Sequence, residues 1–305
     1  RTRYRQPLRG TVSVINTVAV LGAGTMGHGI AYEAAMSGFD TRLYDVSEEV
    51  LERSRSLIDA IGTKAVELGK LRPNDFEATR ARLDFFTDLS AALSGIEMVI
   101  EAVPEQMDLK LSVLREVERH APAEAIVASN TSALSVTEIS SALTQPQRVA
   151  GMHFFNPVPV MKLVEVVRTI ATSDETFDRA FAFSRALGKA PVAAKDNSGF
   201  IVNLLLVPYM LDAIRQLERG VAGVEDIDTA MALGCGYPMG PFILCDFVGL
   251  DTLNMIGEIM YEEYREARYA PPPLLKRIVA MGRFGRKTGM GFYDWSGDKP
   301  TALPL

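Results

Sequence analysis

Short apolar runs, each followed by a turn or a helical stretch, fill the first two-thirds of the chain. Runs of this length are typical of strands that are buried on both faces of a parallel sheet. They lie at residues 17–21, 40–45, 83–86, 98–103, 125–129, 148–153 and 163–167. Helical stretches such as residues 109–119 separate several of them. The pattern therefore predicts a doubly wound α/β sheet.

The hydrophobic pattern changes near residue 198. From there on it follows helical periodicity, with punctuation at Gly220, at residues 238–241 and at the prolines of residues 271–273. The stretch 200–217 is apolar over most of its circumference, and such a helix is normally enclosed by a core or by a partner subunit. We therefore expect two domains, an α/β domain over residues 12–198 and an all-helical domain over residues 199–305.

A glycine-rich turn, Gly-Ala-Gly-Thr-Met-Gly-His at residues 22–28, follows the first apolar run and opens a helical stretch. Strand, turn and helix in this order receive a pyrophosphate on backbone N–H groups and on the helix dipole. Gly22 permits the tight turn, Gly24 lets a cofactor approach the backbone, and Gly27 lets the helix pack against the strand. The second run ends on Asp45, whose carboxylate can bind the ribose hydroxyls of NAD and would repel the 2′-phosphate of NADP. The α/β domain is therefore predicted to be a Rossmann-like domain that binds NAD.

One connection in this domain is longer than the fold requires. A largely helical segment, about residues 46–82, lies between Asp45 and the run at 83–86, whereas a βαβ crossover needs only about a dozen residues. The excess predicts a helical arm with a task of its own. Its Lys64, Lys70 and Arg72 are candidate partners for phosphate, and an ordinary solvated helix face is the open alternative.

Composition narrows the classes of ligand and compartment. The chain has 305 residues, of which 48% are hydrophobic and 23% charged, as in soluble globular proteins. Its formal net charge of −6 argues against general nucleic-acid binding, so an anionic ligand needs a local basic patch. The only two cysteines, Cys235 and Cys245, lie in apolar surroundings without metal-ligand spacing. They predict buried thiols and no metal site, in a reducing compartment such as the cytoplasm.

The sequence carries only weak signals for a membrane span and for an N-terminal targeting segment. The longest apolar stretch, residues 200–211, contains Asn203 and Pro208 and is short for a membrane span, so no membrane association is expected. The first nine residues carry four arginines and no acid. They predict a solvated tail, with a trace of a targeting segment as the alternative.

Three histidines are available as general bases. His28 lies in the glycine turn, and His120 ends a charged helical stretch, where a cation caps the helix favourably. His153 ends an apolar run, at the edge where parallel sheets bind their ligands. It is therefore the candidate general base, and a hydrogen-bonded core histidine is the alternative.

Glu165 interrupts the next apolar run, Leu-Val-Glu-Val-Val at residues 163–167. A carboxylate there is costly unless it is paired, and an imidazole on the preceding strand would both pair with it and be oriented by it. A side chain that points to solvent from the sheet margin is the alternative. The segment Ser129-Asn-Thr-Ser132 follows another run and brings small hydroxyls to the same edge, or else forms a helix cap.

These motifs together resemble the L-3-hydroxyacyl-CoA dehydrogenase family, most closely its short bacterial 3-hydroxybutyryl-CoA dehydrogenases. The resemblance runs from about Thr17 to Trp295. It rests on the segments 22–27, 129–132, 153–159, 162–165, 199–203, 240–241, 248–252 and 284–293.

The resemblance implies an NAD-dependent oxidation of a short L-3-hydroxyacyl-CoA, in which His153 is the base and Glu165 orients it. Ser132 would hold the reacting oxygen, and Asn203 would help position the substrate. The implied cofactor contacts are Gly22, Gly24, Thr25, Met26, Gly27, Asp45, Glu105, Lys110, Ser132, Asn156 and Lys287. The arm would help bind coenzyme A, with Lys64 and Lys70 as candidates, and the helical domain would form a homodimer. A place in fatty acid β-oxidation follows from the same resemblance.

Three rival interpretations remain at this point. The gulonate dehydrogenases share the fold and the His–Glu pair but act on a free sugar acid. The 6-phosphogluconate and β-hydroxyacid dehydrogenases use a lysine base on their helical domain, whereas this chain offers a His–Glu pair on the sheet. The third rival is a non-catalytic dinucleotide-binding protein, against which the set Ser132, His153, Glu165 and Asn203 speaks.

Overall fold

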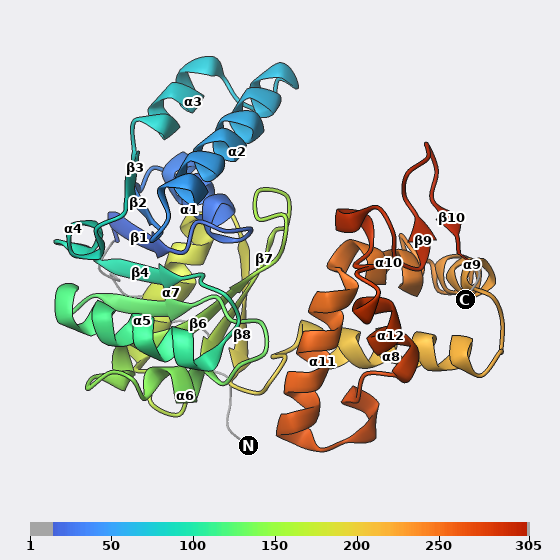
Figure 1. Ribbon diagram of the computed structural model, residues 1–305. Coiled ribbons are helices and arrows are strands. Elements are labelled where there is room, and N and C mark those ends of the chain that lie inside the picture. Colours follow the sequence, from blue (N-terminus) through green and yellow to red (C-terminus); the bar gives the residue numbers. More distant parts are fainter. Residues whose placement is uncertain (1–14, 304–305) are drawn as a thin grey trace. The chain divides into compact units, whose positions relative to one another are not determined.

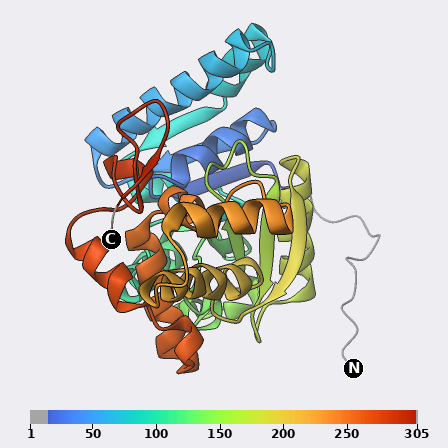
Figure 2. The same cartoon turned by 90° about the vertical axis from the view of Figure 1, so that its right-hand side faces the viewer.

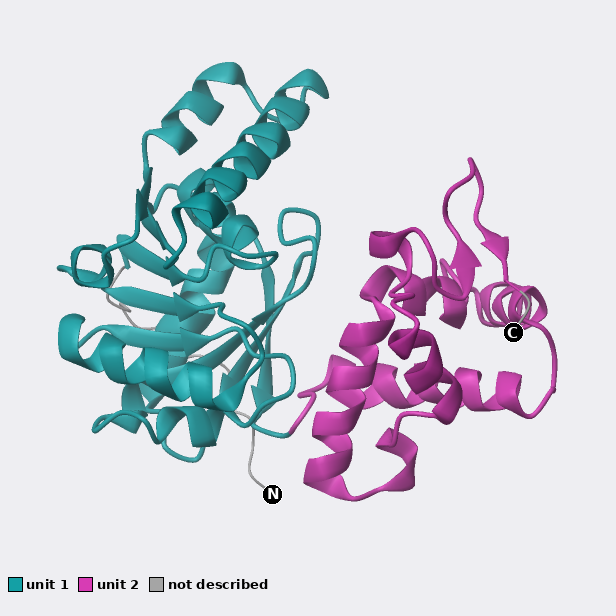
Figure 3. Ribbon diagram, viewed as in Figure 1, with its two compact units in different colours: residues 1–197 teal, residues 198–305 magenta. Residues whose placement is uncertain are grey.

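The computed structural model describes residues 15–303 (Figure 1). The expected solvated tail at residues 1–9 therefore lies outside the described residues. The chain divides into two compact units, of which the first ends at Asn197 and the second begins at Ser198 (Figure 3).

The first unit is built on one sheet of eight strands in the order β3-β2-β1-β4-β5-β6-β7-β8. The strands are β1 (Thr17–Leu21), β2 (Asp40–Tyr44), β3 (Leu83–Phe86), β4 (Met98–Glu101), β5 (Ile126–Ser129), β6 (Val149–Phe154), β7 (Leu163–Arg168) and β8 (Ala190–Lys195). The predicted α/β class is confirmed. The central strands are buried on both faces, as their uninterrupted apolar runs predicted.

The sheet departs from a purely parallel one at a single pair of strands. β6 and β7 run antiparallel, whereas every other neighbouring pair in this sheet is parallel. Only residues 155–162 connect them, which is too short for the helical crossover that parallel strands need. The antiparallel register sets His153 opposite Glu165.

Helices cover both faces of this sheet. α1 (Gly27–Met36) and α7 (Asp174–Ala186) lie on one face, and α5 (Met107–His120) and α6 (Val136–Ser140) lie on the other (Figure 1). The ring of Phe39, just after α1, lies 4.8 Å from that of Phe183 in α7. The short α4 (Leu89–Leu93) and the 3₁₀ turn η1 (Pro146–Arg148) complete the unit.

The expected arm is a pair of helices between β2 and β3. α2 (Glu48–Glu67) and α3 (Pro73–Arg80) extend past the end of the sheet in two perpendicular views (Figure 1, Figure 2). The two helices meet closely where Gly62 faces Phe76, since a Cβ at Gly62 would lie 1.9 Å from the Phe76 ring. Ser47 begins α2, with its side chain accepting a hydrogen bond from the N–H of Val50.

The second unit is helical, as the change of hydrophobic pattern predicted. Its elements are α8 (Val202–Glu218), α9 (Val224–Cys235), α10 (Pro241–Val248), α11 (Leu250–Tyr264), α12 (Pro273–Ala280), the 3₁₀ turns η2 (Ala267–Tyr269) and η3 (Arg286–Thr288), and a small hairpin of β9 (Tyr293–Asp294) and β10 (Thr301–Ala302). Within the described part of the chain, no helix has both the length and the apolarity to span a membrane.

Two buried aspartates hold the second unit together. Asp228 accepts hydrogen bonds from the N–H groups of Phe242 and Ile243, and Asp246 accepts them from Phe292 and Tyr293. Burial raises the pKa of both carboxyls, and these hydrogen bonds act in the opposite direction.

The expectation of two buried cysteines is half wrong. Cys245 is buried, whereas Cys235 is exposed. Cys235 is the last residue of α9, just before Gly236, which adopts a left-handed conformation and ends the helix. Its apolar sequence neighbours lie on an exposed stretch of the chain and do not enclose it.

Candidate active site

The glycine turn has the backbone geometry that each of its glycines predicted. Gly22 has φ +96°, and a Cβ there would lie 2.8 Å from the carbonyl oxygen of Ala102. A Cβ on Gly27 would lie only 1.7 Å from the carbonyl oxygen of Gly22, whereas one on Gly24 would meet nothing within 4 Å. Gly22 and Gly27 are therefore required by packing, and Gly24 borders open space that fits a cofactor approaching the backbone.

Asp45 lies beside this turn, directly after β2. One carboxylate oxygen accepts a hydrogen bond from the N–H of Ala23 at 2.9 Å, and the other accepts one from the N–H of Ser47 at 3.1 Å. Each oxygen keeps a further lone pair for a ribose hydroxyl. Thr25 is exposed and Met26 half-buried at the start of α1, so the first turn of that helix is accessible to a pyrophosphate.

His153 and Glu165 form a buried pair across β6 and β7. The Nδ1 atom of His153 lies 2.7 Å from Oε2 of Glu165, and the two residues are 4% and 0% exposed. Glu165 therefore does not point to solvent, because β7 lies between β6 and β8. Since a carboxylate is only an acceptor, Nδ1 carries the proton in this hydrogen bond.

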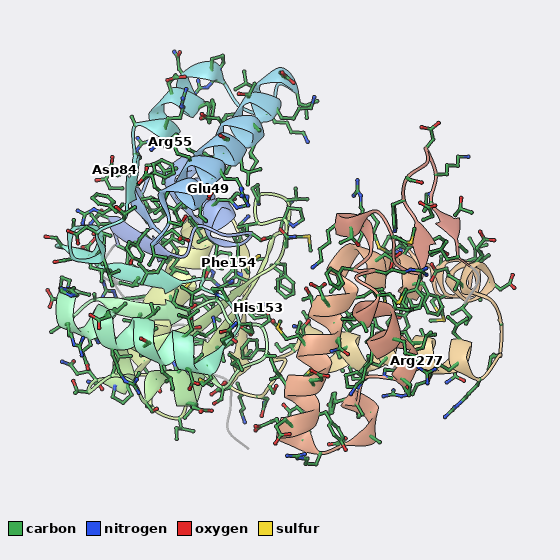
Figure 4. All side chains as sticks on the ribbon, viewed as in Figure 1. Glu49, Arg55, Asp84, His153, Phe154 and Arg277 are labelled. Atoms are coloured by element: carbon green, nitrogen blue, oxygen red, sulfur yellow. The ribbon has the colours of Figure 1, made fainter. Side chains whose placement is uncertain are left out.

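The end of β6 is held in place by neighbouring groups. His153 and Phe154 lie near the carboxyl end of the sheet (Figure 4). The ring of Phe155 lies 4.4 Å from the imidazole of His153. The N–H of Phe154 donates to the side-chain oxygen of Asn130 at 2.9 Å. Asn130 thus ties the serine-containing segment after β5 to the strand that carries His153.

Glu105 also holds the segment after β5, through hydrogen bonds to residues 131–133. The Oε1 atom of Glu105 accepts hydrogen bonds from the hydroxyl of Thr131 at 2.6 Å and from the N–H groups of Ser132 and Ala133 at 2.7 and 3.1 Å. Glu105 also lies 3.3 Å from the ammonium group of Lys110, which is 1% exposed. The hydroxyls of this segment do not cap a helix, because the N-cap of α6 is Ser135.

Glu101 and Asn130 belong to the site and were not predicted from the sequence. Glu101 ends the apolar strand β4 and is completely buried. A carboxylate in an apolar run is the same signal that singled out Glu165, and it was present in residues 98–103. Asn130 carried no such signal, because its role depends on the packing of β5 against β6.

The other predicted residues are spread over loops and the second unit. Asn156 is exposed just after β6, and Lys64 and Lys70 are exposed on and just after α2. Lys64 lies 3.2 Å from Glu67, and Arg72 pairs with Asp75 at 2.7 Å. Asn203 is half-buried in the first turn of α8, and Lys287 in η3 lies 2.6 Å from Asp251.

Comparison with known proteins decides the family. Residues 17–197 match the model of the 3-hydroxyacyl-CoA dehydrogenase NAD binding domain, and residues 199–295 match that of the 3-hydroxyacyl-CoA dehydrogenase C-terminal domain. The chain belongs to the 3-hydroxyacyl-CoA dehydrogenase family. It is accordingly an NAD-dependent oxidoreductase, with NAD bound by the first unit.

Members of the family resemble the chain over most of its length. The human mitochondrial hydroxyacyl-coenzyme A dehydrogenase is 45% identical over 288 residues, which cover 92% of each chain. A 3-hydroxybutyryl-CoA dehydrogenase of Mycobacterium tuberculosis is 45% identical over 283 residues, covering 92% of this chain and 99% of that protein. The crystal structure of M. tuberculosis FadB2 superposes with a TM-score of 0.91 at 44% identity, covering 93% of this chain and 100% of that chain.

Proposed function

We propose that this 3-hydroxyacyl-CoA dehydrogenase oxidises short L-3-hydroxyacyl-CoA esters, with 3-hydroxybutyryl-CoA as the representative substrate, and that the reaction is reversible. The observation that carries this proposal is the buried His153–Glu165 pair at 2.7 Å. The relatives, a hydroxyacyl-coenzyme A dehydrogenase and a 3-hydroxybutyryl-CoA dehydrogenase, indicate the substrate class.

His153 is the proposed general base. Its Nε2 takes the proton of the 3-hydroxyl group, and the Glu165 carboxylate stabilises the imidazolium that results, 2.7 Å from Nδ1. In the reverse direction the same nitrogen returns the proton to the carbonyl oxygen. NAD supplies the acceptor for the hydride that leaves C3.

Two further residues orient the substrate in this proposal. Ser132 hydrogen-bonds the reacting oxygen, and its backbone is already fixed by Glu105. Asn203 acts from the second unit. Both act by alignment, because holding the reacting atoms in one geometry lowers the entropic part of the barrier.

The proposed cofactor site extends from the glycine turn along the end of the sheet. Asp45 selects NAD over NADP, since its carboxylate would repel a 2′-phosphate. The Lys110 ammonium donates hydrogen bonds to Glu101 and to the carbonyl oxygen of Val103 and forms an ion pair with Glu105, so a contact with the cofactor would compete with these partners. The proposed contacts are Gly22, Gly24, Thr25, Met26, Gly27, Asp45, Glu105, Lys110, Ser132, Asn156 and Lys287.

The arm is the proposed binding site for the nucleotide part of coenzyme A. Lys64 and Lys70 are exposed and lie on or beside α2, in a protein with a net charge of −6. Local cations are therefore required to attract the phosphates of the substrate. The nearby Glu67, 3.2 Å from Lys64, must give up that contact when a phosphate binds.

We further propose that the protein is a homodimer formed through the second unit and works in fatty acid β-oxidation in the cytoplasm. In support of the dimer, several large apolar side chains of this unit are exposed, a feature of surfaces that bind other proteins. They include Leu205, Val221, Leu233, Phe247 and Met281. In support of the compartment, both cysteines are free thiols.

Steady-state kinetics with matched substrates test the proposed activity. We expect NADH to form from L-3-hydroxybutyryl-CoA, with much less from the D isomer, from free 3-hydroxybutyrate and from free gulonate. In the reverse direction, acetoacetyl-CoA should be reduced with NADH in preference to NADPH. Turnover of free gulonate that matches the CoA ester would favour the rival free-acid enzyme, and no turnover of any substrate would favour a non-catalytic protein.

A further inference from the structure

A buried carboxylate that the proposed reaction does not use lies beneath the serine loop, residues 129–133. Glu101 is the last residue of β4 and pairs with Ser129 of β5 on one side and with Leu21 of β1 on the other. It therefore stands between the loop that carries Ser132 and the strand that leads into the glycine turn. Its side chain is 0% exposed.

Each oxygen of Glu101 has a defined partner. Oε2 accepts a hydrogen bond from the Ser129 hydroxyl at 2.6 Å, and that hydroxyl accepts one from the N–H of Thr131 at 3.3 Å. Oε1 accepts hydrogen bonds from Lys110 and from the N–H of Val103, both at 2.8 Å. One side of the carboxylate thus holds the serine loop directly, and the other holds a lysine.

Lys110 connects Glu101 to the second acid of the site. Its ammonium group lies 2.8 Å from Glu101, 3.3 Å from Glu105 and 3.2 Å from the carbonyl oxygen of Val103. The ammonium group therefore donates hydrogen bonds to Glu101 and to Val103 and forms an ion pair with Glu105. Glu105 in turn holds the Thr131 hydroxyl and the N–H of Ser132. Glu101 reaches the serine loop by two routes, through Ser129 and through Lys110 with Glu105.

Stability alone does not account for this arrangement. Taking charged groups out of water costs several kcal/mol per ion, and well-packed apolar side chains often serve stability equally well. Three buried or nearly buried charges converge here on one loop of five residues. Charged hydrogen bonds are short and directional, so they fix positions more closely than apolar contacts do.

We propose that Glu101 is a positioning residue for the dehydrogenase reaction, which sets the place of the Ser132 hydroxyl through Ser129 and through the Lys110–Glu105 pair. The inference rests on the proposed role of Ser132. Glu101 does not touch the substrate in this account. It acts only by fixing the loop from which Ser132 reaches the reacting oxygen.

The substitution Glu101→Gln, made in the wild-type protein and in a Ser132→Ala variant, tests this inference. Glu101→Gln keeps the shape of the side chain but removes the charge and replaces one of the two accepting oxygens with an amide N–H₂ group. We expect kcat for L-3-hydroxybutyryl-CoA to fall by about tenfold, since small misplacements of aligned groups have effects of that order or larger. In a Ser132→Ala background the same substitution should change kcat by less than about twofold, because residues that act through one another are not additive.

Two further variants distinguish a positioning role of Glu101 from a general loss of protein stability. Ser129→Ala removes the hydroxyl route with little change in volume and should show the same dependence on Ser132, even where Glu101→Gln fails to fold. Glu33→Gln is the control, because Glu33 is also a buried glutamate paired with a lysine, Lys189, at 2.8 Å. Glu33→Gln should lower the melting temperature. Any effect of this substitution on kcat should be the same in the wild-type protein and in the Ser132→Ala variant.

The outcomes are distinct from those that test the function itself. If Glu101→Gln or Ser129→Ala lowers kcat by the same factor in both backgrounds, or not at all, the positioning role is wrong while the dehydrogenase activity stands. If Ser132→Ala alone leaves kcat unchanged, the role of Ser132 fails and this inference with it. Absence of activity in the wild-type protein would contradict the proposed function instead.

Discussion

At the scale of single residues, two buried glutamates in the sheet bind different polar groups of the candidate site. Glu165 pairs with the imidazole of His153, and Glu101 pairs with a hydroxyl and an ammonium group. The same feature, a carboxylate that interrupts an apolar run, marks both in the sequence. Their partners follow only from strand order and register, which set His153 opposite Glu165 and Ser129 opposite Glu101.

The His153–Glu165 pair gives the first prediction. His153→Gln should lower kcat by ~10²–10⁴, the usual contribution of a positioned acid–base group, and leave the affinity for NADH largely unchanged. Glu165→Gln should also lower kcat, because an amide stabilises an imidazolium less than a carboxylate does. Steady-state kinetics and NADH fluorescence titration measure the two effects. A His153→Gln enzyme with nearly normal kcat would remove the assignment.

At the scale of elements, the glycine turn and the β6–β7 hairpin bring the site together. The turn was predictable from the sequence, because the spacing of its glycines is typical of a strand–turn–helix unit that binds a dinucleotide. The antiparallel direction of β7 was not predicted, because an apolar run has no direction of its own. The eight residues 155–162 between the strands were the available signal, since so short a connection does not hold a crossover helix.

The glycine turn gives the second prediction, with a matched pair of substitutions. Gly27→Ala should destabilise the protein by ~1–3 kcal/mol or more, because its Cβ would lie 1.7 Å from the Gly22 carbonyl oxygen. Gly24→Ala should leave the melting temperature nearly unchanged, because nothing lies within 4 Å of its Cβ, and should weaken NAD binding. Thermal melts and NADH titration distinguish them. Unaltered NADH affinity in Gly24→Ala would show that the cofactor does not approach there.

The arm gives the third prediction. Lys64→Glu combined with Lys70→Glu should raise KM for acetoacetyl-CoA and make it more sensitive to salt, since exposed charges are only partly screened at moderate ionic strength. The kcat should change little, because the arm binds a part of the substrate remote from the reacting atoms. Salt series of KM measure this effect.

A truncated thioester that lacks the nucleotide is the control for the arm. The wild-type enzyme should turn it over poorly, and the double substitution should not affect it. If acetoacetyl-CoA kinetics also ignore the substitutions, the two lysines are ordinary solvated charges.

At the scale of the whole molecule, the chain folds into two compact units that meet in sequence at residues 197 and 198. The change of hydrophobic pattern near residue 198 predicted this division, because a sheet and a helical bundle bury apolar residues with different periods. The exposure of Cys235 was not predictable in the same way. Apolar neighbours in sequence do not enclose a residue at a helix end, where the chain turns away.

The buried aspartates of the second unit give the fourth prediction. Since burial raises the folded-state pKa of Asp228 above its ordinary value of 3.8, the native state holds more protons than the unfolded state just above that pH. The contribution of Asp228 is therefore complete at low pH and is lost as pH rises through its raised pKa. The stability advantage of the wild type over Asp228→Asn should therefore shrink as pH rises above the ordinary pKa of 3.8 and through the raised pKa of Asp228.

Trp295 is the only tryptophan of the chain and donates a hydrogen bond to Asp246, so its fluorescence reports on this unit during unfolding. Asp294→Asn is the control with the opposite sign. Hydrogen bonds from Ser296 lower the pKa of Asp294, so the wild-type advantage there should grow as pH rises. Parallel pH trends for the two variants would contradict the assignment of these shifts.

We propose that this chain moves a hydride from C3 of an L-3-hydroxyacyl-CoA to NAD. L-3-hydroxybutyryl-CoA with deuterium at C3 tests this transfer through the mass of the NADH that forms. We expect one deuterium in each NADH produced, and none when the label is at C2 instead. NADH that carries no deuterium from C3, or no NADH at all from this ester, would show that the chain does not carry out this transfer.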